Sequence, residues 1–141
     1  MTVERSAPDE GRRRSVSSEI STGLVQLVRD YTGRGPTKAR TYISDNLVTC
    51  VLQDSLTRGE RMLAELQGHE RILDHRKAFQ KAMRRDAEAL VEQATGRKVI
   101  AFLSDNHIEP DVAVETFLLE ELPKTDGGER IEDAWQDPGE R

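Results

Sequence analysis

The sequence is poor in cysteine, because Cys50 is the only one among 141 residues. A single thiol cannot form an intramolecular disulfide, which excludes a disulfide-stapled fold and fits a reducing, cytoplasmic environment. Cys50 lies in an apolar run, and no residue near it in the sequence offers a general base. We therefore interpret Cys50 as a small buried side chain rather than a nucleophile.

Long apolar runs and an excess of positive charge are also lacking. No run approaches the roughly 18 apolar residues that suggest a membrane-spanning helix, and the first residues lack the apolar core of a signal peptide. The formal net charge is −5, so there is no general attraction to nucleic acid or anionic lipid. We expect a soluble protein that neither binds nucleic acid nor inserts directly into a membrane.

Motifs for metal and nucleotide binding are missing as well. His69 and His75 are six residues apart, so they fall on different faces of a helix and do not make a zinc site with Cys50. There is no glycine-rich phosphate loop of the Walker or dinucleotide type. We expect no metal, no cofactor, no catalytic residues and no enzymatic activity.

Two parts of the sequence repeat the same short motifs in the same order. Thr-Gly-Arg occupies residues 32–34 and 95–97, and Ser-Asp-Asn occupies residues 44–46 and 104–106. A Gly after an amphipathic stretch commonly ends a helix in the left-handed conformation, and Asp and Asn favour the turn of a β-hairpin. The repetition predicts two helix–hairpin units and suggests an internal duplication.

Apolar periodicity predicts a first helix that begins at Ser17 or Ser18 and a long central helix from about Glu70 to Thr95. The basic side of the long helix, which includes Arg76, is expected to face solvent. A short helix is predicted over residues 58–67. Thr57 and Glu60 form its capping box, and its apolar side chains are expected to point inward: Met62, Leu63 and Leu66.

Alternating and continuous apolar runs predict the strands. The first hairpin pairs residues 41–43 with 47–53, and the second pairs residues 99–103 with about 113–119. The sequence therefore predicts an α+β fold: two helix–β-hairpin units forming a mostly antiparallel four-stranded sheet packed by helices. We expect a disordered segment over residues 1–16, a single domain over 17–122, and a disordered acidic tail over 123–141 in which Trp135 has no assigned role.

Two polar clusters are candidate binding sites. Arg34, Lys38 and Arg40 follow the first helix closely and are candidates for binding an anion or an acidic partner, although Arg34 would also suit the last carbonyls of that helix. The second candidate is a polar loop that would bind a partner. The alternative explanation for its polar residues is that they form Asx-turn hydrogen bonds with the nearby backbone. The loop residues are Asp105, Asn106, His107 and Asp111.

Five short motifs give the chain a resemblance to the MpsC family. They are Gly-Arg-Gly-Pro-Thr-Lys-Ala-Arg at 33–40, Leu-Thr-x-x-Glu at 56–60, Thr-Gly-Arg-Lys-Val at 95–99, Ser-Asp-Asn-His-Ile at 104–108 and Pro-Asp-Val-Ala-Val-Glu at 110–115. The family is named for a sodium-translocating, membrane-potential-generating system. The resemblance implies a soluble accessory component that works by binding, without catalysis, in a membrane cation or bicarbonate-linked transport system.

The same resemblance implies that integral-membrane transport subunits are partners. It also implies that the protein is cytoplasmic and is held at the inner face of the cell membrane through these partners. The alternative function is a regulator that binds a small anion or metabolite through Arg34, Lys38 and Arg40. A second copy of the chain is a further expected partner. Both faces of the predicted sheet are apolar and the short helix is too small to cover one, so we expect an exposed face and a homodimer.

Overall fold

The computed structural model describes residues 2–123, with side-chain positions from residue 15 onward. It confirms the predicted α+β class, with three helices and four strands in this part of the chain. The elements in order are α1 (Thr2–Thr32), β1 (Lys38–Ser44), β2 (Leu47–Gln53), α2 (Arg58–Gln67), α3 (His69–Thr95), β3 (Val99–His107) and β4 (Val112–Leu119).

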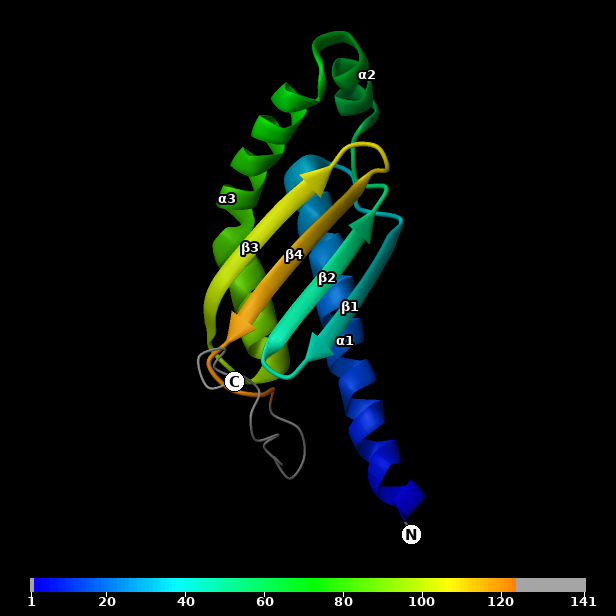
Figure 1. Ribbon diagram of the computed structural model, residues 1–141, viewed down its shortest axis with the longest axis vertical. Helices are drawn as coiled ribbons and strands as arrows, with labels where there is room; N and C mark the ends of the chain where they lie inside the picture. The colour runs from blue at the N-terminus through cyan, green and yellow to red at the C-terminus, as the bar shows by residue number, and fades with distance from the viewer. Residues whose placement is uncertain (1, 124–141) are drawn as a thin grey trace, which may run out of the picture.

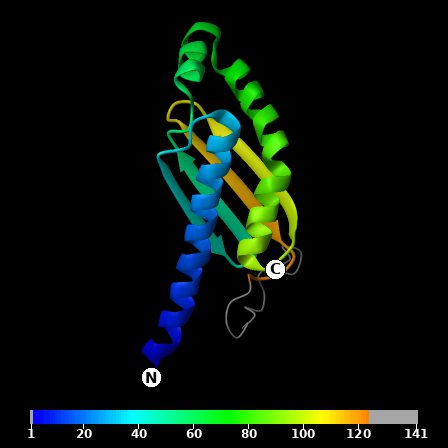
Figure 2. The same cartoon turned by 180° about the vertical axis from the view of Figure 1, so that it is seen from behind.

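The four strands form one antiparallel sheet in the order β1-β2-β4-β3. The second strand of each hairpin lies in the centre, where β2 pairs with β4, and the first strand of each lies at an edge. The long helices α1 and α3 cover the same face of this sheet, and α2 lies beyond its end (Figures 1 and 2). Two helix–hairpin units therefore share one continuous sheet.

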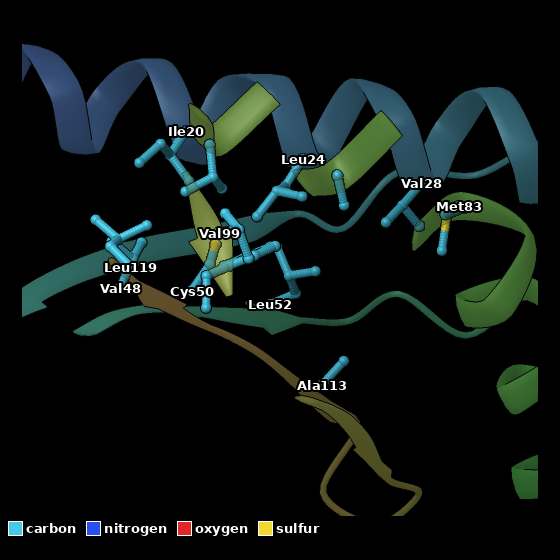
Figure 3. Packing of buried hydrophobic residues seen from close by; sticks show 13 residues of the cluster. Ile20, Leu24, Val28, Val48, Cys50, Leu52, Met83, Val99, Ala113 and Leu119 are labelled. Atoms are coloured by element: carbon cyan, nitrogen blue, oxygen red, sulfur yellow. The ribbon is translucent and has the colours of Figure 1, made fainter. Parts of the chain in front are cut away.

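The main core lies between the sheet and the two long helices. Ile20, Leu24 and Val28 of α1 are spaced four residues apart, which directs all three toward the sheet (Figure 3). Burying one such side chain fully contributes roughly 1.5–3 kcal/mol, so this stripe is enough to fix α1 on the sheet. The buried residues that they join are Val48, Cys50, Leu52, Met83, Ala87, Val91, Val99, Ala113, Phe117 and Leu119.

The first helix is longer than the sequence analysis predicts. It begins at Thr2 rather than at Ser17 or Ser18, so it continues through the segment expected to be a disordered lead-in. The prediction gave weight to Pro8 and Gly11 as helix breakers. The residues at 12–14 are arginines, which favour helix, and they join the lead-in to the amphipathic stretch without a break.

The repeated Thr-Gly-Arg motif has the same local structure in both units. Gly33 and Gly96 have positive φ angles of 86° and 69°, which confirms the predicted left-handed helix ends. Before each glycine, Thr32 and Thr95 donate their hydroxyl protons to the carbonyl four residues earlier, at 2.7 Å in both cases. In both helices the threonine hydroxyl thus bonds back to the carbonyl one turn earlier, a common pattern for Ser and Thr in a helix.

The arginine of each motif ties the end of its helix to the exit of its own hairpin. Arg34 Nη1 donates to the carbonyl of Leu56 at 2.7 Å, and Arg97 Nε donates to the carbonyl of Leu122 at 2.7 Å. Each acceptor lies three residues beyond the last residue of the hairpin's second strand. Arg97 also pairs with Glu121 at 2.9 Å. The two units are thus equivalent in structure at this motif.

The Ser-Asp-Asn motif, by contrast, differs between the units. In the first hairpin it forms the turn, where Asp45 has a φ of 53°. In the second hairpin residues 104–106 continue β3, and the turn comes later, over residues 108–111. The predicted turn at 104–106 is wrong because β4 extends back to Val112, which leaves these residues paired backbone to backbone.

Candidate partner-binding surfaces

A buried ion pair positions α2 on α3. Arg76 of α3 donates to both carboxylate oxygens of Glu60, at 2.6 and 2.8 Å, and to the carbonyl of Ser55 at 2.7 Å. The side chains of Arg76 and Glu60 are only 5% and 7% exposed. Arg76 therefore belongs to the interior, and its predicted place on a solvent-facing side of the long helix is wrong.

Glu60 has a second role at the start of α2. Its carboxylate accepts the backbone amide of Thr57 at 2.8 Å, while the Thr57 hydroxyl accepts the backbone amide of Glu60 at 3.1 Å. This is the predicted capping box, and the bounds predicted for the helix are confirmed. Because one carboxylate serves both the cap and the ion pair, the start of α2 is fixed with respect to α3.

The apolar side chains of α2 face away from the rest of the molecule. Met62, Leu63 and Leu66 are 56%, 43% and 78% exposed, so their predicted inward orientation is wrong. The inner side of the helix is formed instead by Glu60 and Ala64, which are four residues apart and buried. Helix α2 lies at the end of the molecule (Figure 1). It presents these three large apolar side chains to solvent.

A second polar network connects the base of α2 to the sheet. Asp54, directly after β2, pairs with Arg34 at 2.9 Å and with Arg61 of α2. Arg61 also lies 3.3 Å from Asp111, whose carboxylate accepts the backbone amide of Leu56 at 2.9 Å. The hydrogen bond from Arg34 is the main cause of the lowered pKa of Asp54. The network lies where the chain leaves the sheet for α2, and it favours the ionised form of Asp54.

A hollow of about 280 Å³ lies beside this network, between α2 and the β3–β4 turn. Its wall mixes charges of both signs, with Arg61, Glu65, His69 and Glu109 among the lining residues. Within residues 2–123, no group of three His, Cys, Asp or Glu side chains is arranged to hold a metal ion. The mixed charge gives the hollow no selectivity for one class of ligand.

The face of the sheet opposite the helices, here called the outer face, is not covered by any helix or strand among residues 2–123 (Figures 1 and 2). Its side chains alternate with the buried inner ones and align in four rows across the strands. In the order β1, β2, β4, β3 the rows are Ser44, Leu47, Leu118, Ala101; Tyr42, Thr49, Thr116, Leu103; Arg40, Val51, Val114, Asp105; and Lys38, Gln53, Val112, His107.

The basic cluster predicted from the sequence is divided by the structure. Lys38 and Arg40 are exposed on the outer face of β1, and the Arg40 guanidinium lies 5.9 Å from the centre of the Tyr42 ring. Arg34 lies in the loop before β1 and has three hydrogen bonds, to the carbonyls of Asp54 and Leu56 and to the Asp54 carboxylate. Anion binding by these three residues stays a prediction. Of the three, Arg34 is already hydrogen-bonded within the protein.

The predicted polar loop is also divided. Asp105 and His107 belong to β3 and lie on the outer face, whereas Asn106 between them lines a small cavity on the inner side. His107 Nδ1 lies 2.8 Å from the carbonyl of Pro110. Asp111 is in the network that holds α2. The four residues therefore do not share one surface, and a partner-binding role for them as a set stays a prediction.

Sequence reasoning missed a buried polar row on the inner face of the sheet. Thr41, Cys50, Glu115 and Ser104 are aligned across the four strands. Burial raises the pKa of Glu115 to about 7, against the opposing effects of the Ser104 hydroxyl and the Arg76 guanidinium. Burial likewise raises the pKa of the Cys50 thiol. The available signal was a lone acid at an inward position of β4, between Ala113 and Phe117.

None of the helices in the described part of the chain has the length and apolar character needed to cross a bilayer. A family model described as "Na+-translocating membrane potential-generating system (MpsC)" matches residues 12–121. No curated protein and no solved structure gives a significant match. The matched range contains the whole sheet, α2 and α3, and it includes α1 from residue 12 onward.

Proposed function

The chain belongs to the MpsC family, and we propose that it is a non-enzymatic component that binds the integral-membrane subunits of a cation-translocating or bicarbonate-linked transport assembly. The family description supplies the association with Na+ translocation and membrane potential. The proposed place of action is the cytoplasmic side of the membrane, where the chain would be held through these subunits.

The observation that carries the proposal is the exposed apolar side of α2. Met62, Leu63 and Leu66 lie at positions i, i+1 and i+4, which puts them on one side of the helix. Helices with such a stripe are commonly recognised in an apolar groove of a partner protein. Fully burying one such side chain gives roughly 1.5–3 kcal/mol, so even partial burial of three contributes substantially to binding.

Rigidity supports the same surface. The buried Glu60–Arg76 pair and the capping box fix α2 before a partner arrives, so binding does not have to order the helix first. The buried side of α2 is formed by Glu60 and Ala64, which leaves its large apolar side chains exposed. A helix held in this way is suited to contact rather than to stabilising its own fold.

A protein subunit fits this surface better than lipid does. Helices that lie in a membrane interface are generally longer and carry a strongly basic polar side. Helix α2 has ten residues, and Glu65 stands among its exposed apolar ones. The net charge of −5 adds no attraction to anionic lipid.

Binding to native membranes tests the proposal. Membrane vesicles from the source cells should bind the purified chain, and the variant with Leu63→Ser and Leu66→Ser should lose most of this binding while keeping its helical circular dichroism. The matched control is Gln67→Ser, which makes a similar change to helix propensity on α2 without removing apolar surface. Equal binding of the double variant would overturn the role of α2. Equal binding to protein-free liposomes made from the extracted lipids would overturn a protein partner.

A further inference from the structure

We infer that the outer face of the sheet binds a second copy of this chain, with a two-fold axis running along the strand direction. The surface concerned is separate from the apolar side of α2, so the inference does not rest on the proposed function. Two sheets packed face to face with nearly parallel strands form the ordinary architecture of a β-sandwich.

The middle of the outer face has the composition of such an interface. Its two central strands contribute leucine, valine and threonine side chains, with one glutamine at the end of β2. Toward the edges, Tyr42 and Leu103 are 53% and 65% exposed and lie in the same row. The side chains between them are partly exposed, and a contiguous apolar area of this kind usually marks an interaction site.

The charges at the two edges identify the occupant. Lys38 and Arg40 lie along β1, and Asp105 lies along β3 at the opposite edge. Arg40 and Asp105 share a row but are separated by three strand spacings, roughly 14 Å, which is too far for a direct pair within one copy. Neither forms an ion pair within the described part of the chain. Each copy therefore offers one basic and one acidic edge.

The direction of the two-fold axis follows from these edges. An axis along the strands places β1 of one copy opposite β3 of the other, so Arg40 faces Asp105 of the second copy, and symmetry repeats the pair at the other edge. An axis across the strands would place β1 opposite β1 and gather the basic residues Lys38 and Arg40 of both copies at one edge. Opposite charges favour the first arrangement and like charges oppose the second.

The area of the outer face sets the expected affinity of the dimer. Four strands of about seven residues cover roughly 450 Å² in projection, which is below the roughly 800 Å² per partner of a standard interface. We therefore expect a dimer that dissociates in the micromolar range rather than an obligate one. Measurements have to include concentrations up to about 200 µM to follow its formation.

A charge exchange tests both the surface and the axis. In sedimentation equilibrium at low salt, the wild-type chain should associate to a dimer. Arg40→Asp alone and Asp105→Arg alone should each raise the dissociation constant about tenfold, because each replaces two attractive contacts by repulsive ones. The variant with both exchanges restores opposite charges and should return to within about threefold of wild type. Arg58→Asp, an exposed reversal on α2, is the matched control and should have little effect.

A monomer at all concentrations up to about 200 µM would overturn the inference. A dimer whose dissociation constant is the same in all of these variants would also overturn it, since another surface would then be responsible. The variant with Leu63→Ser and Leu66→Ser should dimerise normally, which separates this inference from the proposed role of α2. Loss of the dimer in that variant would assign self-association to the helix and would likewise contradict the inference.

Discussion

At the scale of single residues, Glu115 is an acid whose burial makes its charged form costly. Glu115 is 6% exposed, and its Oε2 atom has no hydrogen-bond partner among the described residues. A charge in such a place loses hydration that its neighbours replace only in part, so the neutral form is favoured. The pKa of about 7 follows from that burial.

Substituting Glu115→Gln should remove a pH-dependent part of the stability. The unfolded chain releases this proton near pH 4.5 and the folded chain near pH 7, so the contribution of Glu115 is present below pH 4.5 and lost as the pH rises to about 7. At about pH 8 the variant should be more stable than wild type by about 1–3 kcal/mol, and near pH 4.5 the two should be similar. Urea unfolding of both proteins across this range measures the difference. If the difference in unfolding free energy between the two proteins were the same at every pH, the raised pKa of Glu115 would be contradicted.

Breaking the buried Glu60–Arg76 ion pair should lower the free energy of unfolding far more than breaking an exposed ion pair does. Arg76→Ala leaves the Glu60 carboxylate buried without its cation, which typically costs about 3–5 kcal/mol. Arg84→Ala on the same helix removes the exposed pair with Glu88, separated by 3.3 Å, and should cost under about 0.5 kcal/mol. Chemical unfolding of both variants provides the comparison. Similar losses in the two would show that the Glu60–Arg76 pair has no special structural role.

At the scale of elements, the two Thr-Gly-Arg motifs end their helices in the same way. Gly33 has a φ of 86°, and a Cβ atom there would meet nothing within 4 Å. Any cost of a larger residue at this position comes from the backbone conformation rather than from a clash. The glycine is therefore required by the end of the helix, and the space around it is free.

Alanine substitutions at two glycines should have opposite signs. Gly33→Ala should destabilise by about 1 kcal/mol, because alanine resists the left-handed conformation. Gly59→Ala in the first turn of α2 should stabilise by about 0.5 kcal/mol, since an added Cβ would only reach the Thr57 hydroxyl at 3.9 Å and alanine favours helix. Thermal unfolding measures both. If Gly59→Ala destabilised the protein as much as Gly33→Ala, the left-handed conformation of Gly33 could not explain the effect of its substitution.

For α2, the bounds are easier to predict from the sequence than the face that the helix buries. Thr57 and Glu60 placed α2 correctly because capping depends on neighbouring residues alone. The side of α2 that turns inward depends on Arg76, which is 16 residues from its partner Glu60. A buried ion pair between distant residues leaves no periodic signal in the sequence, so apolar periodicity alone predicts the wrong inner side for α2.

Sheet pairing across the chain explains the other differences. The register of β2 with β4 joins the two hairpins, and it also brings Cys50 beside Glu115, which no local motif indicates. The extension of β3 through residues 104–106 likewise depends on the reach of β4. The predicted fold class needed only the order and type of the elements, and the buried polar row needed the tertiary pairing itself.

At the scale of the whole molecule, the two exposed apolar surfaces have different positions. The outer face lies opposite α1 and α3, whereas α2 lies beyond the end of the sheet (Figures 1 and 2). A dimer formed through the outer face would leave α2 of each copy exposed. The proposed assembly would therefore present two equivalent contact helices to a membrane complex, which raises the effective affinity without new contacts.

The most direct test of the account is the Na+-dependent membrane potential of source cells that lack this chain. A potential-sensitive dye should report a loss of that potential in the deletion strain, with recovery on expression of the wild-type chain or of Gln67→Ser. The variant with Leu63→Ser and Leu66→Ser should accumulate as a folded protein without restoring the potential. Full recovery with this variant, or a potential unaffected by the deletion, would contradict a function based on α2 docking to a membrane transport assembly.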